Sequence, residues 1–172
     1  NDESGNGHHG TVSGATLTTD RYGTASKAYS FDGTNDRISA AIPALPQGSQ
    51  ARTMSLWLKA GILEGDNRIA ANWGAASTGQ AFGFLEANQP SQFRELWFYD
   101  HNQNCNSTRQ LDTAWHHVVA TYDSSTVSVY MDGSLAVNAA KVLNTLGTNL
   151  LMGVGVSGAN YWHGKIDDVR IY

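Results

Sequence analysis

Residues 115–123 read WHHVVATYD, and the alternation in this stretch decides the fold class. Trp115 and His117 fall on one side of an extended chain, while His116 and Val118 fall on the other. A period of two residues is typical of a β-strand, because successive side chains point to opposite faces. Both sides carry bulky side chains, so we expect a strand that is covered on both faces.

The same period recurs along the chain and is broken at intervals of about eight to fifteen residues, as in β-sandwiches. It is seen in RTMSLWLK at 52–59, ELWFY at 95–99, TVSVYM at 126–131 and KIDDVRIY at 165–172. Many short strands without a clear long helix favour an all-β protein. We therefore predict a two-sheet antiparallel jelly-roll sandwich.

Asp132-Gly133 follows the strand predicted over 126–131 and is a strong signal for a hairpin turn, which needs positive φ at its central residues. The return strand would contain Leu135, Val137 and Ala139. The same region also fits a short helix, with an apolar stripe through Leu135, Ala139, Val142, Leu143 and Leu146. The sequence alone leaves both alternatives open.

The composition limits the classes of function. The chain has 172 residues, one domain's length, with a net charge of −4, 41% hydrophobic and 15% charged residues. No cluster of Lys and Arg is present to displace counterions, so we expect no nucleic-acid partner. No apolar run approaches the roughly 20 residues that cross a bilayer, so we expect no membrane insertion. Cys105 is a single cysteine and cannot form an internal disulfide.

Four stretches resemble the laminin G-like, concanavalin A-like jelly-roll domains of secreted bacterial proteins. They are DESGNGHHG at 2–10, AYSFDG at 28–33, WHHVVATYD at 115–123 and GKIDDVRIY at 164–172. The resemblance runs from end to end and implies a single domain over residues 1–172. Together with a start at Asn1 rather than Met, it suggests a module of a larger protein that is secreted or held at the cell surface. This sandwich hosts lectins, carbohydrate-binding modules, adhesin domains and some enzymes.

Alternation in the last strand predicts that Asp167 lies on the same side as the apolar residues Val169 and Ile171. An unpaired carboxylate facing an apolar interior would cost several kcal/mol, so a partner is expected. A metal ion, a backbone turn or an arginine would serve.

Related jelly-roll domains often hold a structural calcium ion between the N-terminal loop and the last strand. That resemblance suggests Asp2, Asn6, Asp32 and Asp167 as ligands of a Ca²⁺ cofactor, and oxygen ligands suit this ion. The alternative is that Asp2 and Asp32 form Asx turns and Asp167 caps a strand end.

Aromatic side chains with nearby amides suggest a carbohydrate site. We interpret Trp57 and Trp115 as packing residues, because they lie in strands that match the family motifs. The remaining tryptophans are freer, and Trp97 and Tyr99 project from one side of a strand. The predicted ligand-binding residues are Trp73, Trp97, Tyr99, His101, Asn102 and Trp162, with the main cluster on a concave sheet face. The alternative for each aromatic residue is ordinary half-buried packing.

A catalytic pair of carboxylates is harder to find. The Glu-x-Asp-x-x-Glu pattern of sandwich-fold glycosidases begins at Glu64 but has Ile69 in its last position. Glu86 and Glu95 remain as the alternative pair, which a hairpin would have to bring together for hydrolysis. We therefore expect a non-catalytic carbohydrate-binding or adhesive module whose partner is a polysaccharide or other glycan. The alternatives are a glycoside hydrolase or polysaccharide lyase, or an adhesin domain that binds a protein partner.

Overall fold

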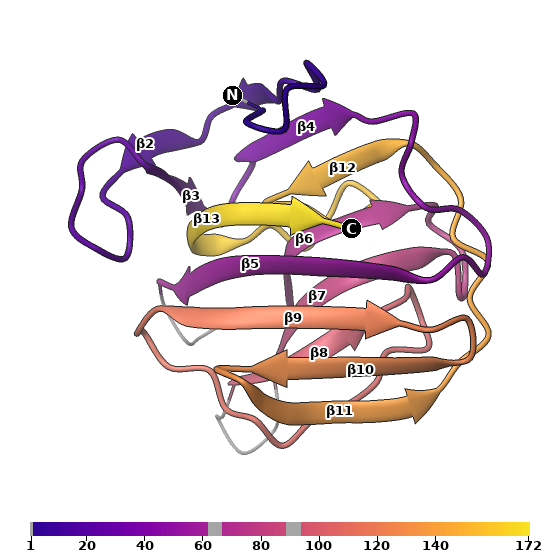
Figure 1. Cartoon of the computed structure of the whole chain (residues 1–172). Coiled ribbons are helices and arrows are strands. Elements are labelled where there is room, and N and C mark those ends of the chain that lie inside the picture. Colours follow the sequence, from indigo (N-terminus) through magenta and orange to yellow (C-terminus); the bar gives the residue numbers. More distant parts are fainter. Residues whose placement is uncertain (1, 62–66, 89–93) are drawn as a thin grey trace.

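The computed structural model describes residues 2–61, 67–88 and 94–172, which form two antiparallel sheets packed face to face (Figure 1). The described residues contain strands and no helix, so none of them forms a membrane-spanning helix. The predicted all-β jelly-roll sandwich is confirmed.

The six-stranded sheet contains, in spatial order, β1 (Thr11–Ser13), β4 (Arg37–Ala41), β12 (Asn149–Met152), β6 (Arg68–Gly74), β7 (Ala81–Asn88) and β8 (Arg94–Tyr99). The seven-stranded sheet contains β11 (Ser134–Ala140), β10 (Thr126–Met131), β9 (His116–Tyr122), β5 (Arg52–Ala60), β13 (His163–Ile171), β3 (Ala28–Asp32) and β2 (Thr16–Thr18). In Figure 1 the seven-stranded sheet lies in front, with β5 and β9 across its middle.

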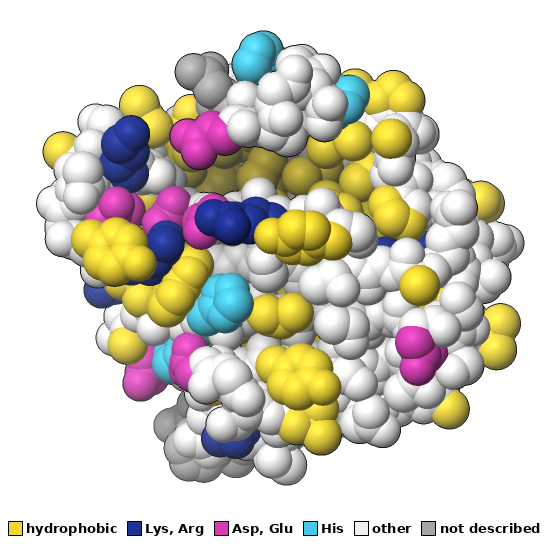
Figure 2. All heavy atoms as spheres, viewed as in Figure 1, with side chains coloured by type: hydrophobic (Ala, Val, Ile, Leu, Met, Phe, Trp, Pro, Cys, Tyr) yellow, Lys and Arg dark blue, Asp and Glu magenta, His cyan; other side chains and the backbone are white. Residues whose placement is uncertain are grey.

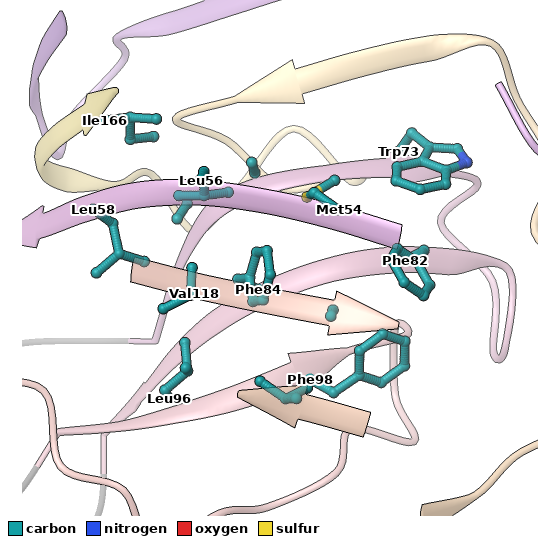
Figure 3. Close-up of a cluster of buried hydrophobic side chains, with 14 of the residues drawn as sticks. Met54, Leu56, Leu58, Trp73, Phe82, Phe84, Leu96, Phe98, Val118 and Ile166 are labelled. Carbon is teal, nitrogen blue, oxygen red and sulfur yellow. The ribbon is translucent and has the colours of Figure 1, made fainter. Parts of the chain in front are cut away.

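The main core fills the space between the two sheets (Figure 3). In β5, every second residue is fully buried, and the residues between them are only half-buried. Since one face of each sheet is apolar and packs against the other, burial of these side chains provides the main favourable free energy of folding. The largest apolar side chains in this core are Trp73, Trp162, Phe31, Phe82, Phe84, Phe98, Met54, Leu56, Leu58 and Leu96.

The β10–β11 hairpin confirms one of the two alternatives for residues 134–146. Asp132 and Gly133 have φ values of 50° and 76°, as the tight two-residue turn between paired Met131 and Ser134 requires. The return segment is the strand β11 rather than a helix, and Val142 beyond it is 91% exposed. Leu143 is buried in the core whereas Leu135, Val142 and Leu146 are exposed, so the five residues of the helical stripe do not share one buried face.

A β-bulge in β13 overturns the predicted orientation of Asp167. Ile166 faces the core, and Asp167 pairs with Trp57 of β5 on the outer face of the seven-stranded sheet. The register shifts between Asp167 and Arg170, where Asp168 has a φ of 51°. The extra residue reverses the alternation, so Val169 returns to the core side while Asp167 stays outside.

Candidate functional site

The outer face of the six-stranded sheet carries a second, smaller apolar cluster. It is formed by Ile69, Ala81, Leu85, Ala87 and Tyr99, with the partly buried Trp97 and Val156 packed against it. Leu85 pairs with Trp97 across β7 and β8, and Gly83 pairs with Tyr99. As predicted, Trp97 and Tyr99 therefore share one side of β8.

A cavity of about 170 Å³ opens beside this cluster. Its lining combines two apolar residues of the sheet with a tyrosine, a histidine, a serine and four asparagines. These are Asn67, Ile69, Leu85, Tyr99, His101, Asn102, Asn104, Ser157 and Asn160. Three of the predicted ligand-binding residues, Tyr99, His101 and Asn102, are thus brought together, and Trp97 lies next to the lining residue Leu85.

Tyr99 and His101 form the polar centre of the cavity. The Tyr99 hydroxyl lies 3.0 Å from Nδ1 of His101, within hydrogen-bonding distance. Burial raises the pKa of Tyr99 to about 12, so its hydroxyl stays protonated at neutral pH. The Tyr99 hydroxyl can therefore both donate and accept a hydrogen bond, as binding of a hydroxyl-rich ligand requires.

Three lining residues adopt backbone conformations that are uncommon for residues other than glycine. His101, Asn102 and Asn160 have φ values of 60°, 79° and 60°. Such conformations cost free energy and persist where the surrounding contacts hold them. Asparagine tolerates this region best, because its short side chain hydrogen-bonds locally. The turn after β8 therefore projects His101 and Asn102 into the cavity rim.

The asparagines are tied to the scaffold but keep unused hydrogen-bonding capacity. Asn160 donates from Nδ2 to the carbonyl of Asn67 at 2.9 Å, and Asn104 Oδ1 accepts the Asp100 N–H at 3.2 Å. Each amide side chain has two donors and an acceptor oxygen, so these bonds leave further positions for a ligand. Such a set matches sugar hydroxyls, which both donate and accept.

The segment between β12 and β13 forms one wall of the cavity and is pinned to the sheet. The Gly153 N–H donates to the Ala70 carbonyl at 2.8 Å, and Nδ2 of buried Asn72 donates to the Val154 carbonyl at 2.7 Å. Gly155 lies so close to Ile69 that an added Cβ would sit 3.2 Å from its Cγ1. The wall is therefore preformed by backbone contacts.

Two predicted ligand-binding residues, Trp73 and Trp162, do not reach this face. Both side chains are fully buried in the core between the sheets. Trp73 lies within β6 rather than in a turn, and its indole N–H donates to the Pro46 carbonyl at 3.2 Å. Their assignment as ligand-binding residues was wrong, because the sequence around them did not reveal which face each indole occupies.

Trp57 packs against neighbouring side chains, as interpreted from the sequence, but it does so outside the main core. It lies on the outer face of the seven-stranded sheet, where its ring packs 5.1 Å from His117 and 4.8 Å below the Arg21 guanidinium. It therefore packs under surface side chains and not in the main core.

Glu86 and Glu95 point to opposite faces of the six-stranded sheet. Glu86 faces the interior, 1% exposed, with Oε1 3.5 Å from Nε of Arg94. Glu95 is on the outer face, where Oε2 accepts the Trp97 indole N–H at 2.9 Å. The pair therefore lacks the shared site that hydrolysis needs. Glu64 lies outside the described residues. Within the described part of the chain, no carboxylate lines the cavity.

The four predicted calcium ligands are engaged with separate partners. Asp2 accepts the N–H groups of Ser4 and His8 at 2.9 and 3.0 Å, and Asn6 hydrogen-bonds to Ser4. Asp32 accepts the Thr34 N–H at 2.8 Å, as in an Asx turn. Asp167 forms an ion pair with Arg21, whose Nη1 lies 2.7 Å away.

The structure therefore does not support a calcium site built from this set. No group of three or more His, Cys, Asp or Glu residues that would hold a metal occurs in residues 2–61, 67–88 and 94–172. The turn and arginine alternatives account for the three carboxylates, and the residues do not fit as a common calcium cage. A structural calcium ion stays a prediction from the sequence.

Comparison with known proteins identifies the family. A sequence model of the concanavalin A-like lectin/glucanases superfamily matches residues 32–172, and the chain belongs to this superfamily. No curated protein matches the sequence.

Several solved structures share the fold. Domain 4 of an extracellular arabinanase from Geobacillus stearothermophilus, in complex with arabinotriose, has a TM-score of 0.67 at 19% identity, over 95% of this chain and 81% of that one. A carbohydrate-binding protein from Bacteroides ovatus, described as putative, has a TM-score of 0.65 at 21% identity, over 85% and 43%.

A sialidase from Trypanosoma rangeli, bound to the inhibitor DANA, has a TM-score of 0.66 at 11% identity, over 95% and 27%. This chain thus spans less than half the length of two of the three proteins. At these identities the likeness concerns the fold.

Proposed function

We propose that this domain binds a glycan on the outer face of the six-stranded sheet and does not transform it. The observation that carries the proposal is the cavity of about 170 Å³, which places four asparagines and the Tyr99–His101 pair beside an aromatic surface. Flat aromatic faces pack against sugar C–H groups with little loss of conformational entropy, while amides and hydroxyls bind the sugar hydroxyls.

The size of the cavity suggests how the ligand lies. Pockets that enclose a drug-sized ligand have volumes of about 300–1,000 Å³. A cavity of about 170 Å³ suits a single sugar residue, with the rest of the chain lying across the sheet past Trp97. Trp97 would then pack against the neighbouring residue.

Binding without hydrolysis is favoured over an enzyme, because the described carboxylates are not arranged as a pair at this site. The superfamily and the neighbours bound to arabinotriose or a sialidase inhibitor support a carbohydrate partner. By the same likeness, we propose that the domain works outside the cell as part of a larger protein.

Isothermal titration against a panel that begins with arabinotriose and extends to longer neutral and acidic oligosaccharides tests the proposal. We expect Trp97→Ala to weaken binding about tenfold or more, equivalent to about 1.4 kcal/mol. Tyr172→Ala is the matched control, because Tyr172 is an aromatic residue 69% exposed and paired with Thr53 of the other sheet. Absence of binding to every glycan, or equal loss in both variants, would refute the site.

A further inference from the structure

The outer face of the seven-stranded sheet contains a second cavity, of about 210 Å³, on the side of the sandwich away from the site above. Its lining includes Lys59, Lys165, His163, Thr113 and Ser30. Figure 2 looks onto this sheet and shows basic, acidic and hydrophobic side chains gathered at the left, over β13 and β5.

Lys59 and Lys165 are direct cross-strand partners in the β5–β13 pairing. Paired residues on neighbouring antiparallel strands point to the same face, with Cβ atoms about 4.5–5.5 Å apart. Two like charges at this spacing repel each other and destabilise the sheet. The chain nevertheless places two of its four lysines here, although its net charge is −4.

Nearby carboxylates do not neutralise the two lysines. Across the described residues, neither lysine forms an ion pair, and the only side-chain hydrogen bond is a long one of 3.4 Å from Lys165 Nζ to Thr19 Oγ1. Asp167, the next outward residue of β13, is held by Arg21 at 2.7 Å.

The carboxylate on the Thr113 side is also engaged. Asp112 accepts hydrogen bonds from the Ala114 N–H and lies 3.1 Å from Nε2 of His116. Lys59 contributes only the smallest of the effects that lower the pKa of Asp112. Asp32 pairs with His163 across β3 and β13, so it is the carboxylate on this face closest to the lining, but it forms no ion pair with either lysine among the described residues.

The remaining lining groups add hydrogen-bond donors. Thr113 and Ser30 carry hydroxyls, and each lysine ammonium offers three N–H donors. His163 has a lowered pKa because of burial, so its ring is neutral near pH 7 and provides one N–H. Its Nδ1 is buried without a partner among the described residues.

Gly164 permits the close approach of the two strands at this point, since a Cβ there would lie 2.1 Å from the Lys59 carbonyl oxygen. The backbone thus fixes the spacing of the lysines. At about 30 Å³ per water, 210 Å³ has room for a compact oxyanion with several waters.

We propose that this cavity binds an oxyanion through Lys59 and Lys165, namely the sulfate or carboxylate group of an acidic saccharide. An anion between the two ammonium groups removes their repulsion and forms charge-assisted hydrogen bonds. The saccharide part of this inference rests on the proposed function, whereas oxyanion binding by the cavity does not.

Amide NMR titration of the whole chain with sodium sulfate, against sodium chloride at equal ionic strength, tests the cavity alone. Thermal melting is less suitable, because sulfate stabilises folded proteins without binding a site. We expect saturable shifts at Gly61, Gly164 and Lys165 that chloride does not cause.

The same titration with a sulfated oligosaccharide and with a uronic-acid oligosaccharide shows whether the cavity binds the sulfate or the carboxylate group of a saccharide. A neutral oligosaccharide of equal length is the reference. We expect at least one acidic oligosaccharide to shift the same three amides. Lys59→Gln or Lys165→Gln should weaken sulfate binding about threefold, and the double variant about tenfold, the scale of partly exposed ion pairs.

Lys27→Gln is the matched control, because Lys27 is exposed and does not line the cavity. If sulfate acts no differently from chloride, or if Lys27→Gln weakens binding as much as Lys59→Gln, the oxyanion site is refuted. If sulfate binds but no acidic saccharide does, the saccharide assignment fails and the cavity remains. Loss of glycan binding in Trp97→Ala is a separate result, so the two proposals fail independently.

Discussion

The buried carboxyl of Glu86 should make stability depend on pH in a way that one substitution removes. Glu86 is 1% exposed, and neither of its oxygens accepts a hydrogen bond within the described residues. Burial, partly opposed by Arg94 and Arg68, raises the pKa of Glu86 from 4.5 to about 7. The folded state therefore favours the protonated form.

The direction and size of this pH dependence follow from the difference between the pKa values of Glu86 in the folded and unfolded chain. Between pH 4.5 and 7 the folded chain binds a proton that the unfolded chain has released, so the stabilising contribution is complete below pH 4.5 and is lost as pH rises through 7. A shift of about 2.5 pKa units corresponds to about 3 kcal/mol at 1.36 kcal/mol per unit. Because the side chain is buried, solvent screening does not reduce this figure much.

The assay is urea unfolding of the wild type and Glu86→Gln from pH 4.5 to pH 8. Glutamine cannot ionise, so the free energy of unfolding of the wild type should fall by about 3 kcal/mol relative to the variant across this range. The test compares how the free energy of unfolding changes with pH in the two proteins. The altered contact with Arg94 shifts the variant's values by the same amount at every pH, so it does not affect this comparison. Parallel curves would refute the raised pKa and the buried environment behind it.

Three further predictions concern the core, a glycine and the calcium ion. Leu56→Ala, at a fully buried position, should lower the free energy of unfolding by about 2–5 kcal/mol, whereas Leu135→Ala, 52% exposed, should change it by about 0.5 kcal/mol or less in the same urea titration. Gly83→Ala should destabilise the fold by about 1–3 kcal/mol, because its Cβ would lie 2.3 Å from the Ala71 carbonyl oxygen; an unchanged unfolding midpoint would contradict the close β6–β7 packing. If the predicted calcium ion binds, millimolar Ca²⁺ should raise Tm relative to EDTA, and identical melts would remove calcium from the account.

Alternation in the sequence was sufficient for the fold class and for the shared side of Trp97 and Tyr99. Alternation gave the wrong face where a β-bulge inserted one extra residue into a strand. The β-bulge after Asp167 reverses the two faces of β13, and no turn residue such as glycine marks it in the sequence. The predicted inward carboxylate, and one reason for expecting calcium, depended on that count.

The candidate site was only partly predictable, because its walls come from segments distant in sequence. Tyr99 is the last residue of β8, and His101 and Asn102 follow directly, so all three were found from one stretch of sequence. Asn67 and Asn160 meet through a hydrogen bond between residues 93 positions apart, which a single sequence does not reveal. The chain has 13 asparagines, and no local motif distinguishes these two from the others.

A crystal structure of the domain with its tightest-binding neutral oligosaccharide tests the central claim most directly. We expect one sugar residue in the cavity lined by Tyr99, His101 and Asn102, with the next packed against Trp97 on the outer face of the six-stranded sheet. Density for the ligand elsewhere on the sandwich, with this face free of sugar and of crystal neighbours, would contradict the account.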